Sequence, residues 1–486
     1  MSRKGRRVIS DALHIAVYTL LGAAVVVLAG FAYYVRSQPE LSIWHRAQLD
    51  REFTADSQVE DFAGYLDLEE RLFAQLDEQI YRQVPTGPEQ VLNRYSRGSL
   101  ADPRRWPTAW NRSFEHPSQA PRAGVLLLHG LSDSPYSMRA LGERLAAEQA
   151  WVVGLRVPGH GTAPSGLVSV RWQDMSAAVV LAVRHLRSAI GDAPLYLVGY
   201  SNGGALAVEY SLSALADASL PLPQGIVLMS PEIGVAKAAA LASGLDRVGR
   251  LLGLEKLAWT SIEPEYDTFK YNSFATNAGD VAYRITARIQ QQLDALNRTG
   301  KLTEMPRILA FQSAVDATVT APDLVKHLLA RLPSAGNELV LFDINRRAGI
   351  EPMLKQDPAA VFGPMLKERN LGFDLTLVTN ASVDSTDVVA RHKRHGDSTV
   401  TTTAAVGQWP QGVYSLAHIA LPFSPQDPLY GGPDAAESPG LQLGNVALRG
   451  ERGVLRVAGG VLLRMHWNPF YEHVENRILA FMGLKP

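Results

Sequence analysis

The sequence predicts an α/β fold in which helices flank a mostly parallel, doubly wound sheet. Short, almost purely apolar runs alternate along the chain with longer segments of helical composition. A continuous apolar run is typical of a parallel strand buried on both faces, and strands that alternate with helices form βαβ units. A serine between two glycines also stands at the junction of one such run with a helical segment, at residues 199–203.

The expected strands are apolar runs that end in turn residues. They lie at residues 124–130, 151–157, 194–200, 225–230, 307–313 and 338–343. Helical composition is clearest at residues 137–149, 172–188 and 204–212, with a last helix at 470–482. Parallel neighbours need crossover connections of this kind, so the runs and helices together predict one wound sheet.

Composition narrows the possible functions. The chain has 486 residues, of which 46% are hydrophobic and 20% charged, enough for one large or two moderate cores. A formal net charge of −1 provides no global field that would recruit nucleic acid. There are no cysteines, which excludes disulfides, thiolate metal sites and a cysteine nucleophile.

The N-terminal residues 1–36 predict a transmembrane anchor. Residues 1–11 are basic, and residues 15–35 form an uncharged stretch of 35 − 15 + 1 = 21 residues. As a helix this stretch would span roughly 30 Å, the thickness of a bilayer's hydrocarbon core. Tyr33 and Tyr34 lie at the far end of the stretch, where interfacial aromatic residues are expected.

The basic N-terminus also predicts the topology of this anchor. By the positive-inside rule, the N-terminus lies in the cytoplasm and everything after Arg36 lies outside it. We therefore expect a single-pass protein of a bacterial inner membrane with a periplasmic catalytic domain. The alternative is a cleaved signal peptide, but its apolar region is usually only about 7–15 residues long. Residues 30–32, Gly-Phe-Ala, make a poor cleavage site, so the helix is expected to stay uncleaved.

Residues 37–119 are expected to form a juxtamembrane helical segment followed by an extended connector. Leu68, Leu72, Leu76 and Ile80 recur at the spacing of one helix face. The acidic residues among them favour a helix packed on the main domain over one that lies on an anionic membrane. The proline- and aromatic-rich residues 101–122 indicate the connector, expected to run over the domain surface.

The serine motif predicts nucleophilic catalysis. Residues 199–203 read Gly-Tyr-Ser-Asn-Gly and follow a predicted strand directly, with a predicted helix after them. A G-x-S-x-G sequence in this setting forms a sharp turn that exposes the serine hydroxyl at the sheet edge. Ser201 is therefore the expected nucleophile, close to a helix N-terminus that favours negative charge.

At this point the sequence resembles a known family. The similar motifs are His-Gly-Leu-Ser-Asp-Ser-Pro-Tyr-Ser at residues 129–137, Pro-Gly-His-Gly at 158–161, Trp-Gln-Asp at 172–174 and Gly-Tyr-Ser-Asn-Gly-Gly at 199–204. They resemble the α/β-hydrolase superfamily and, within it, the monoacylglycerol lipase, lysophospholipase and serine aminopeptidase-like branch. The resemblance covers about residues 120–345, resumes near His418, and implies an α/β-hydrolase domain over 120–486.

The resemblance implies an acid and a base to complete a triad, in the order Ser, Asp, His. Asp316, in the Ala-Val-Asp-Ala-Thr-Val sequence that follows a late strand, is similar to the family's acid loop. Glu232 and Asp343, each at a strand end, are reserve candidates.

The base is expected to be His418. The histidines after the acid are His327, His392, His395, His418, His466 and His473. Residues 414–421 resemble the family's histidine loop, and His466 is the alternative. His129 and His160 are also possible candidates for the base, but the resemblance implies structural roles for both.

Two backbone N–H groups are expected to form the oxyanion hole. One is that of Asn202, directly after the nucleophile. The other, implied by the resemblance, is that of Leu131.

Two further segments are expected to be a helical cap, at about residues 231–302, and a late insertion, at about 345–411. An apolar stripe from Val235 to Leu252 could cover an acyl chain or could simply pack on the core. The insertion contains a possible strand at 375–379 and a basic run at 391–395, expected to be a solvated loop. Two histidines three residues apart with no carboxylate pair nearby make a poor metal site.

The leading hypothesis is a membrane-anchored serine hydrolase that cleaves lipid-like carboxylic esters, such as monoacylglycerol or lysophospholipid. Amide, peptide or thioester cleavage and acyl transfer on the same triad are alternatives. A catalytically silent protein of the envelope that binds a lipid or partner is a third. No cofactor, metal or nucleic acid is expected, and the partners are the ester substrate and the membrane. The oligomeric state is not predicted.

Overall fold

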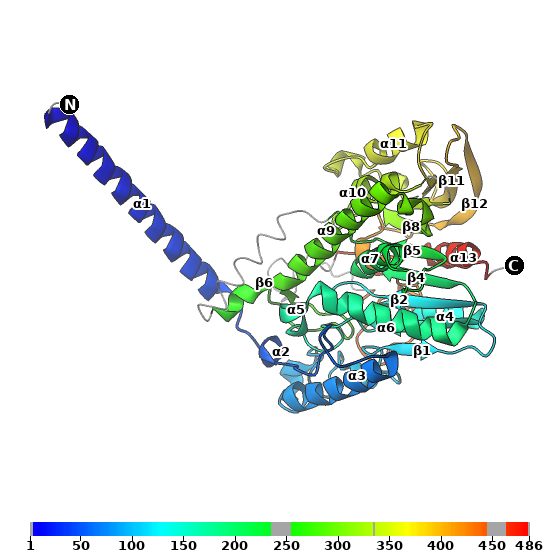
Figure 1. Ribbon diagram of the computed structural model, residues 1–486, viewed down its shortest axis with the longest axis horizontal. Coiled ribbons are helices and arrows are strands. Elements are labelled where there is room, and N and C mark those ends of the chain that lie inside the picture. The colour runs from blue at the N-terminus through cyan, green and yellow to red at the C-terminus, as the bar shows by residue number, and fades with distance from the viewer. Residues whose placement is uncertain (1–2, 235–253, 334–335, 445–462, 485–486) are drawn as a thin grey trace.

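The computed structural model of the chain describes residues 3–234, 254–333, 336–444 and 463–484. A long N-terminal helix, α1 (Arg3–Ser37), projects from a body built around one sheet (Figure 1).

The sheet has ten strands in the order β1-β3-β2-β4-β5-β8-β9-β10-β11-β12. Their bounds are β1 (Phe114–His116), β2 (Ala123–Leu128), β3 (Ala150–Leu155), β4 (Leu195–Tyr200), β5 (Gly225–Met229), β8 (Arg307–Ser313), β9 (Glu338–Phe342), β10 (Asp374–Asn380), β11 (Asp387–Lys393) and β12 (Val400–Gln408). Neighbours from β3 to β10 pair in parallel, while β1, β11 and β12 are antiparallel. The chain moves outward from β2 to β3 and returns to β4 on the other side. The crevice at such a reversal is where parallel sheets place their sites.

Helices cover both faces of this sheet. The longer helices of the body are α3 (Phe62–Leu76), α4 (Arg139–Ala147), α6 (Trp172–Ile190), α7 (Asn202–Ala216), α9 (Thr276–Thr299), α10 (Ala321–His327), α11 (Ala359–Lys367) and α13 (Tyr471–Met482). Leu126 and Leu128 of β2 pack with residues of α6, α7 and α9, whereas Val125 and Leu127 pack with residues of α4 and α13. Alternate side chains of one strand therefore enter two separate cores. The predicted α/β fold, with helices on both faces of a mostly parallel sheet, is confirmed.

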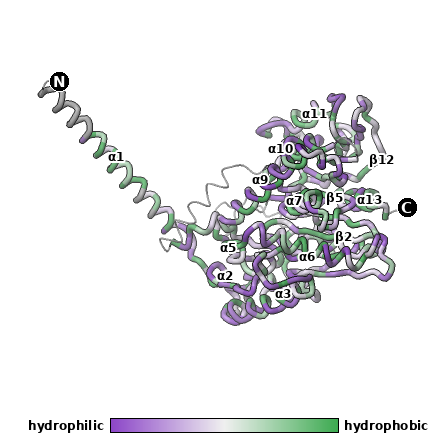
Figure 2. Tube along the Cα trace, viewed as in Figure 1, coloured by the Kyte–Doolittle hydropathy of each residue, from purple (hydrophilic) through white to green (hydrophobic). Residues whose placement is uncertain are grey.

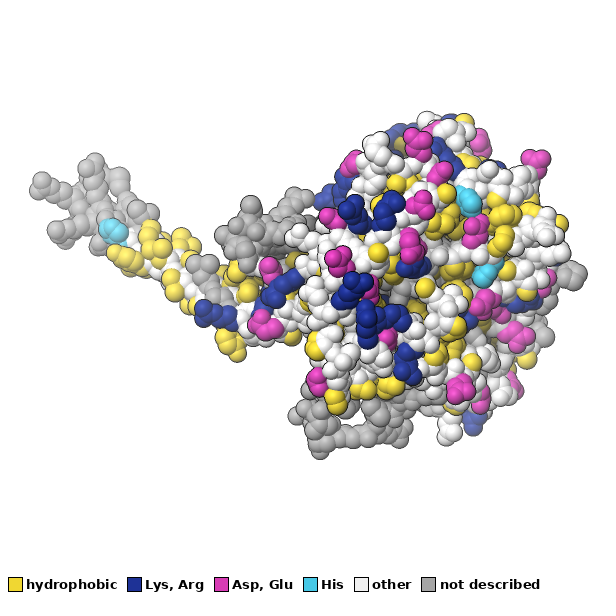
Figure 3. Space-filling view, turned by 90° about the horizontal axis from the view of Figure 1, so that it is seen from below, with side chains coloured by type: hydrophobic (Ala, Val, Ile, Leu, Met, Phe, Trp, Pro, Cys, Tyr) yellow, Lys and Arg dark blue, Asp and Glu magenta, His cyan; other side chains and the backbone are white. Residues whose placement is uncertain are grey.

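Helix α1 is apolar and stands free of the body. Its segment His14–Ser37 is long and apolar enough to cross a membrane. Exposed side chains along it include Tyr18 and Leu20 at 70% and Val26 at 72%. Figure 2 shows this helix as largely hydrophobic, and Figure 3 shows positive and negative side chains interspersed on the body.

The segment between α1 and the sheet packs tightly onto the body. It contains the short helix α2 (Ile43–Arg46) and α3, which buries Tyr65, Leu72 and Leu76. Arg156, fully buried after β3, donates to Glu69 of α3 at 2.9 Å and to both oxygens of Glu52. The expectation that this helix packs on the main domain is confirmed.

The end of the expected connector enters the sheet. Residues 114–116 form β1, which pairs antiparallel with β3 at the sheet edge. Trp106 and Trp110 upstream of it are buried, and Trp106 makes edge contacts with Tyr136 and Phe269. Most of residues 101–122 are exposed or partly exposed, but these tryptophans anchor the connector in the core.

The late insertion extends the sheet. Within the range 345–411, β10 pairs in parallel with β9, and β11 and β12 continue the sheet beyond it. The interpretation of the basic run as a solvated loop is wrong. Residues 391–393 belong to β11, and Lys393 is fully buried with its ammonium bonded to the carbonyls of Met365 and Glu368.

Only part of the expected cap range is described. The stripe from Val235 to Leu252 lies outside the described residues. A two-stranded hairpin, β6 (Trp259–Ser261) and β7 (Phe274–Ala275), precedes α9. Helix α9 packs into the same core as α7, so the described helix of this range flanks the sheet.

Candidate active site

The nucleophile turn lies where β4 meets α7. Ser201 has φ 53° and ψ −117°, a strained conformation for a residue with a side chain. A Cβ on Gly199 would lie 2.2 Å from the carbonyl of Gly203, and one on Gly203 would lie 2.2 Å from that of Leu128. The two glycines are required because backbone fills the space their side chains would need.

The structure brings Ser201, His418 and Asp316 together. The Nε2 atom of His418 lies 3.2 Å from the Oγ of Ser201, and its Nδ1 lies 2.8 Å from Oδ2 of Asp316. All three residues are buried. With Nδ1 donating to the carboxylate, Nε2 is free to accept a proton from the serine.

The Asp316 carboxylate is fixed by its own loop after β8. Its Oδ1 accepts from the N–H groups of Thr318 and Val319 at 2.8 and 3.0 Å. Its Oδ2 accepts from the amide of Gln312 at 3.0 Å in addition to His418. The carboxylate is therefore oriented toward the imidazole before any substrate binds.

The histidine loop is fastened to the ends of β8 and β9. His418 opens the short helix η10 (His418–Ala420). The hydroxyl of Ser313 donates to the carbonyl of Leu416 at 2.8 Å, and the N–H of Asn345 donates to that of Tyr414 at 2.8 Å. These bonds return the chain to the site after the β10–β12 extension.

The expected oxyanion donors lie on either side of Ser201. Asn202 is the first residue of α7, so its N–H has no acceptor within the helix. Leu131 follows Gly130, where an added Cβ would lie 3.2 Å from that of Ser201. Ser132, with φ 61°, accepts at its carbonyl from the N–H of Tyr271 at 2.7 Å, which anchors this loop.

His129 and His160 hold loops. His129 accepts at Nε2 from the N–H of Val157 at 3.0 Å and bonds through Nδ1 to the carbonyl of Gly130. Burial holds its pKa well below the usual value, so the ring is neutral. His160 bonds to the carbonyl of Pro158 at 3.0 Å, and burial lowers its pKa to about 4.

The remaining histidine and acid candidates lie in other contacts. His466 stacks on Tyr430, and burial lowers its pKa to about 4. Asp343 pairs with Arg346 at 2.7 Å and accepts from Thr379. Three other histidines contact groups away from Ser201: His327 lies near Asp323, His392 near Thr376, and His395 near the carbonyl of Leu371. Burial lowers the pKa of His473 to about 4.

Two further acids lie beside the site: Glu232, the reserve candidate for the acid, which does not bond to His418, and Asp133, which was not assigned a role from the sequence. Glu232 accepts from the side-chain amide of Asn202 at 3.0 Å, and burial raises its pKa. Asp133, in the loop after Leu131, is buried, which raises its pKa to about 7. Each lies in the segment that follows a strand, β5 for Glu232 and β2 for Asp133.

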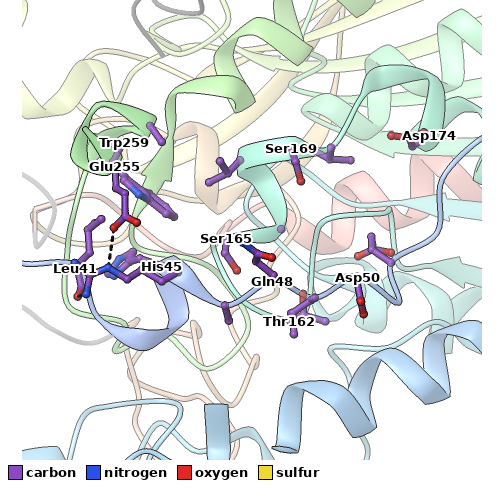
Figure 4. A pocket seen from close by; sticks show the side chains of 18 of the residues that line it. Leu41, His45, Gln48, Asp50, Thr162, Ser165, Ser169, Asp174, Glu255 and Trp259 are labelled. Atoms are coloured by element: carbon purple, nitrogen blue, oxygen red, sulfur yellow. Dashed lines mark hydrogen bonds and ion pairs between the residues drawn. The ribbon is translucent and has the colours of Figure 1, made fainter. Parts of the chain in front are cut away.

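A cavity of about 580 Å³ lies between the segment after α1 and the body (Figure 4). Its walls come from residues 41–54, 162–174 and 255–259 and do not include Ser201, Asp316 or His418. Arg46 and Glu255 at its rim pair at 2.9 Å. Among the residues that the structure describes, no cluster of acids and histidines could hold a metal ion.

Comparison with known families assigns the central part of the chain. Residues 119–345 match the family model described as Serine aminopeptidase, S33, a hydrolase family of the α/β-hydrolase superfamily. This segment is similar to that family. The matched residues include β2 to β9, with the Ser201 turn and the Asp316 loop, whereas His418 lies beyond them.

Solved structures similar to the chain include lipolytic enzymes. A metagenome-derived lipolytic enzyme is 22% identical, over 48% of this chain and 88% of that one, with a TM-score of 0.37. A monoacylglycerol lipase from Paleococcus ferrophilus is 18% identical, over 47% and 87%, with a TM-score of 0.36. A soluble variant of monoglyceride lipase from Saccharomyces cerevisiae is 17% identical, over 47% and 81%, with a TM-score of 0.35. No curated protein matches the sequence.

Proposed function

We propose that the protein is a membrane-anchored serine hydrolase that cleaves carboxylic esters through Ser201, His418 and Asp316. The observation that carries the proposal is the chain of contacts from serine to imidazole to carboxylate, at 3.2 and 2.8 Å. A nucleophile, a base within reach of it, and a group that orients the base are the parts that acyl transfer requires.

In the proposed mechanism, the Oγ of Ser201 attacks the ester carbonyl while its proton passes to Nε2 of His418. The N–H groups of Leu131 and Asn202 donate to the oxyanion of the tetrahedral intermediate. When the intermediate collapses, the carbon–oxygen bond to the leaving alcohol breaks and His418 returns the proton to that alcohol. Water, deprotonated by the same imidazole, then attacks the acyl carbonyl. The bond from this carbonyl to Oγ of Ser201 breaks, the acid leaves, and His418 returns the proton to Oγ.

We propose lipid-like esters as the substrates. The hydrolase family of residues 119–345 and the apolar α1 helix support this choice, because an enzyme anchored in a bilayer meets its substrate at the lipid surface. Monoacylglycerol and lysophospholipid both fit the description.

The test is hydrolysis of p-nitrophenyl esters of increasing acyl length by the full-length protein in detergent, beside Ser201→Ala, His418→Ala and His466→Ala. We expect the first two substitutions to lower kcat by at least about 10³-fold and the third to leave kcat within a few-fold of the parent. Activity retained by Ser201→Ala would refute the proposal. Activity retained by His418→Ala and lost in His466→Ala would identify His466 as the general base in place of His418.

A second candidate function is cleavage of aminoacyl amides by the same residues. The observation that favours it is the family match itself, whose description is a serine aminopeptidase. Matched p-nitrophenyl esters and aminoacyl p-nitroanilides, compared by kcat/KM, separate the two activities. A higher kcat/KM for the anilides would favour the aminopeptidase.

We also propose that α1 anchors the protein with its N-terminus in the cytoplasm. Extraction of membranes with alkaline carbonate should leave the full-length protein in the pellet. Protease added outside spheroplasts should digest the domain after Ser37. Release of an intact protein beginning after the apolar stretch would instead identify a cleaved signal sequence.

A further inference from the structure

Glu232 contacts both Ser201, the proposed nucleophile, and the next residue, Asn202. It lies two residues beyond Ser230, past the end of β5, and its N–H donates to the carbonyl of Ser201 at 2.9 Å. Its Oε2 accepts from the side-chain amide of Asn202 at 3.0 Å. One residue thus bonds to the backbone of the serine and to the side chain of its neighbour.

The bonded carbonyl belongs to the peptide unit that presents the oxyanion donor. The C=O of Ser201 and the N–H of Asn202 are the two ends of one planar amide. A hydrogen bond to the oxygen therefore fixes the direction of the N–H. It also polarises the amide, which makes the N–H a stronger donor.

The rest of this segment also packs on the first turn of α7. A Cβ added to Gly204 would lie 2.8 Å from that of Pro231. The same Ser201 carbonyl accepts from the N–H groups of Gly204 at 2.9 Å and Ala205 at 3.3 Å, both in the first turn of the helix. Glu232 supplies a third donor to this oxygen from outside the helix, and its side chain bonds to the neighbouring Asn202.

We propose that Glu232 is a positioning residue for the oxyanion hole, which aims the Asn202 N–H by holding both sides of the Ser201–Asn202 turn. The inference rests on the proposed function of Ser201. The proposed role applies to any acyl substrate whose carbonyl oxygen becomes negatively charged in the transition state. An N–H group that points away from the oxyanion stabilises the transition state less. Binding of the substrate in the ground state hardly depends on the direction of this N–H.

The test compares kcat and KM of Glu232→Ala, Glu232→Gln, Asn202→Ala and the double variant Glu232→Ala/Asn202→Ala with those of the parent, on the best p-nitrophenyl ester. Loss of a complete oxyanion donor costs about 10²–10³-fold in kcat, so a misaimed one should cost about 10–100-fold. We expect that loss in Glu232→Ala, with KM changed by less than about two-fold. Glu232→Gln should recover most of kcat, because its amide oxygen accepts the same bond.

The double variant separates positioning from general destabilisation. We expect Asn202→Ala to match Glu232→Ala and the double variant to lose no more, since both remove one interaction. The matched control is Glu209→Gln, a buried acid further along α7 that accepts from Ser176 and Ser213 at 2.9 and 3.0 Å. It should leave kcat of the folded enzyme unchanged.

Full kcat in Glu232→Ala, or a loss that falls on KM, would overturn the inference while Ser201→Ala remained inactive. Additive losses in the double variant would overturn it too. If Glu232→Ala does not fold, Asn202→Ala and Glu232→Gln decide: unchanged kcat in Asn202→Ala overturns the inference. A Ser201→Ala variant with full activity would refute the proposed function itself, which is a different result.

Discussion

The two parts of the sheet contribute differently to the site. Strands β2 to β9 are almost wholly buried and carry Ser201 and Asp316 at their ends. Strands β11 and β12 at the far edge are half exposed and carry none of the three proposed catalytic residues. Both parts nevertheless form one continuous sheet (Figure 1).

The difference shows how a fold can admit a long insertion between two residues of one site. The chain leaves the site at the end of β9, builds β10 to β12, and returns at Tyr414. Asn345 and Tyr414 are bonded to each other, so the two ends of the insertion meet. The cost of a longer loop grows only slowly with its length when its ends are held together. His418 therefore reaches Ser201 although 102 residues separate it from Asp316.

The largest expected effect on stability lies on the catalytic side of the comparison. Arg156→Met leaves the buried carboxylate of Glu69 and the partly buried carboxylate of Glu52 without their cation. Breaking a buried ion pair in this way costs about 3–5 kcal/mol of the free energy of unfolding. Urea denaturation of the detergent-solubilised protein measures it. The control is Arg82→Met, an exposed arginine paired with the partly exposed Asp77, which should cost about 1 kcal/mol or less. Equal losses in the two variants would contradict the prediction.

An intermediate effect is expected within the extension. Lys393→Met leaves the carbonyls of Met365 and Glu368, at the end of α11, without their donor. Loss of hydrogen bonds made by a charged group costs about 1.5–3 kcal/mol. Faster amide hydrogen exchange should appear in β11 and β12 and not around Ser201. The exposed Lys367 provides the control, since Lys367→Met should leave exchange unchanged. Faster exchange throughout the sheet would show that the two parts do not unfold separately.

The smallest effect is expected at the link between the two parts. Ser313→Ala removes the donor to the carbonyl of Leu416, two residues before His418. We expect a loss of about 1 kcal/mol in stability and a few-fold decrease in kcat, because the imidazole is held less firmly. Ser211→Ala, which removes a hydroxyl bonded to Ala207 within α7, should lower stability without lowering kcat. Identical kcat in both variants would show that the return loop is held by other contacts.

Much of the fold could be predicted because burial leaves a local pattern. Every apolar run between residues 124 and 343 that predicted a strand overlaps one in the structure, since strands buried on both faces are apolar throughout. The nucleophile turn was equally local, because its two glycines are needed where backbone comes within 2.2 Å of their Cβ positions. Strand β1 and the buried Lys393 were missed, because polar residues became part of the sheet only through distant partners.

The sequence by itself determined the wound sheet, the apolar N-terminal helix, the strained serine turn and the candidates Asp316 and His418. The sheet, the helix and the turn depend on residues close together in the chain: a run of one hydropathy, a spacing, or a turn that only glycine permits. Asp316 and His418 were implied by the resemblance of their loops to those of a known family. Tertiary structure alone decided that His418 lies beside Ser201 while His466 stacks on Tyr430, and that Glu232 contacts the oxyanion turn. Contacts between residues far apart in the chain are set by how strands and helices pack, and no local pattern encodes that packing.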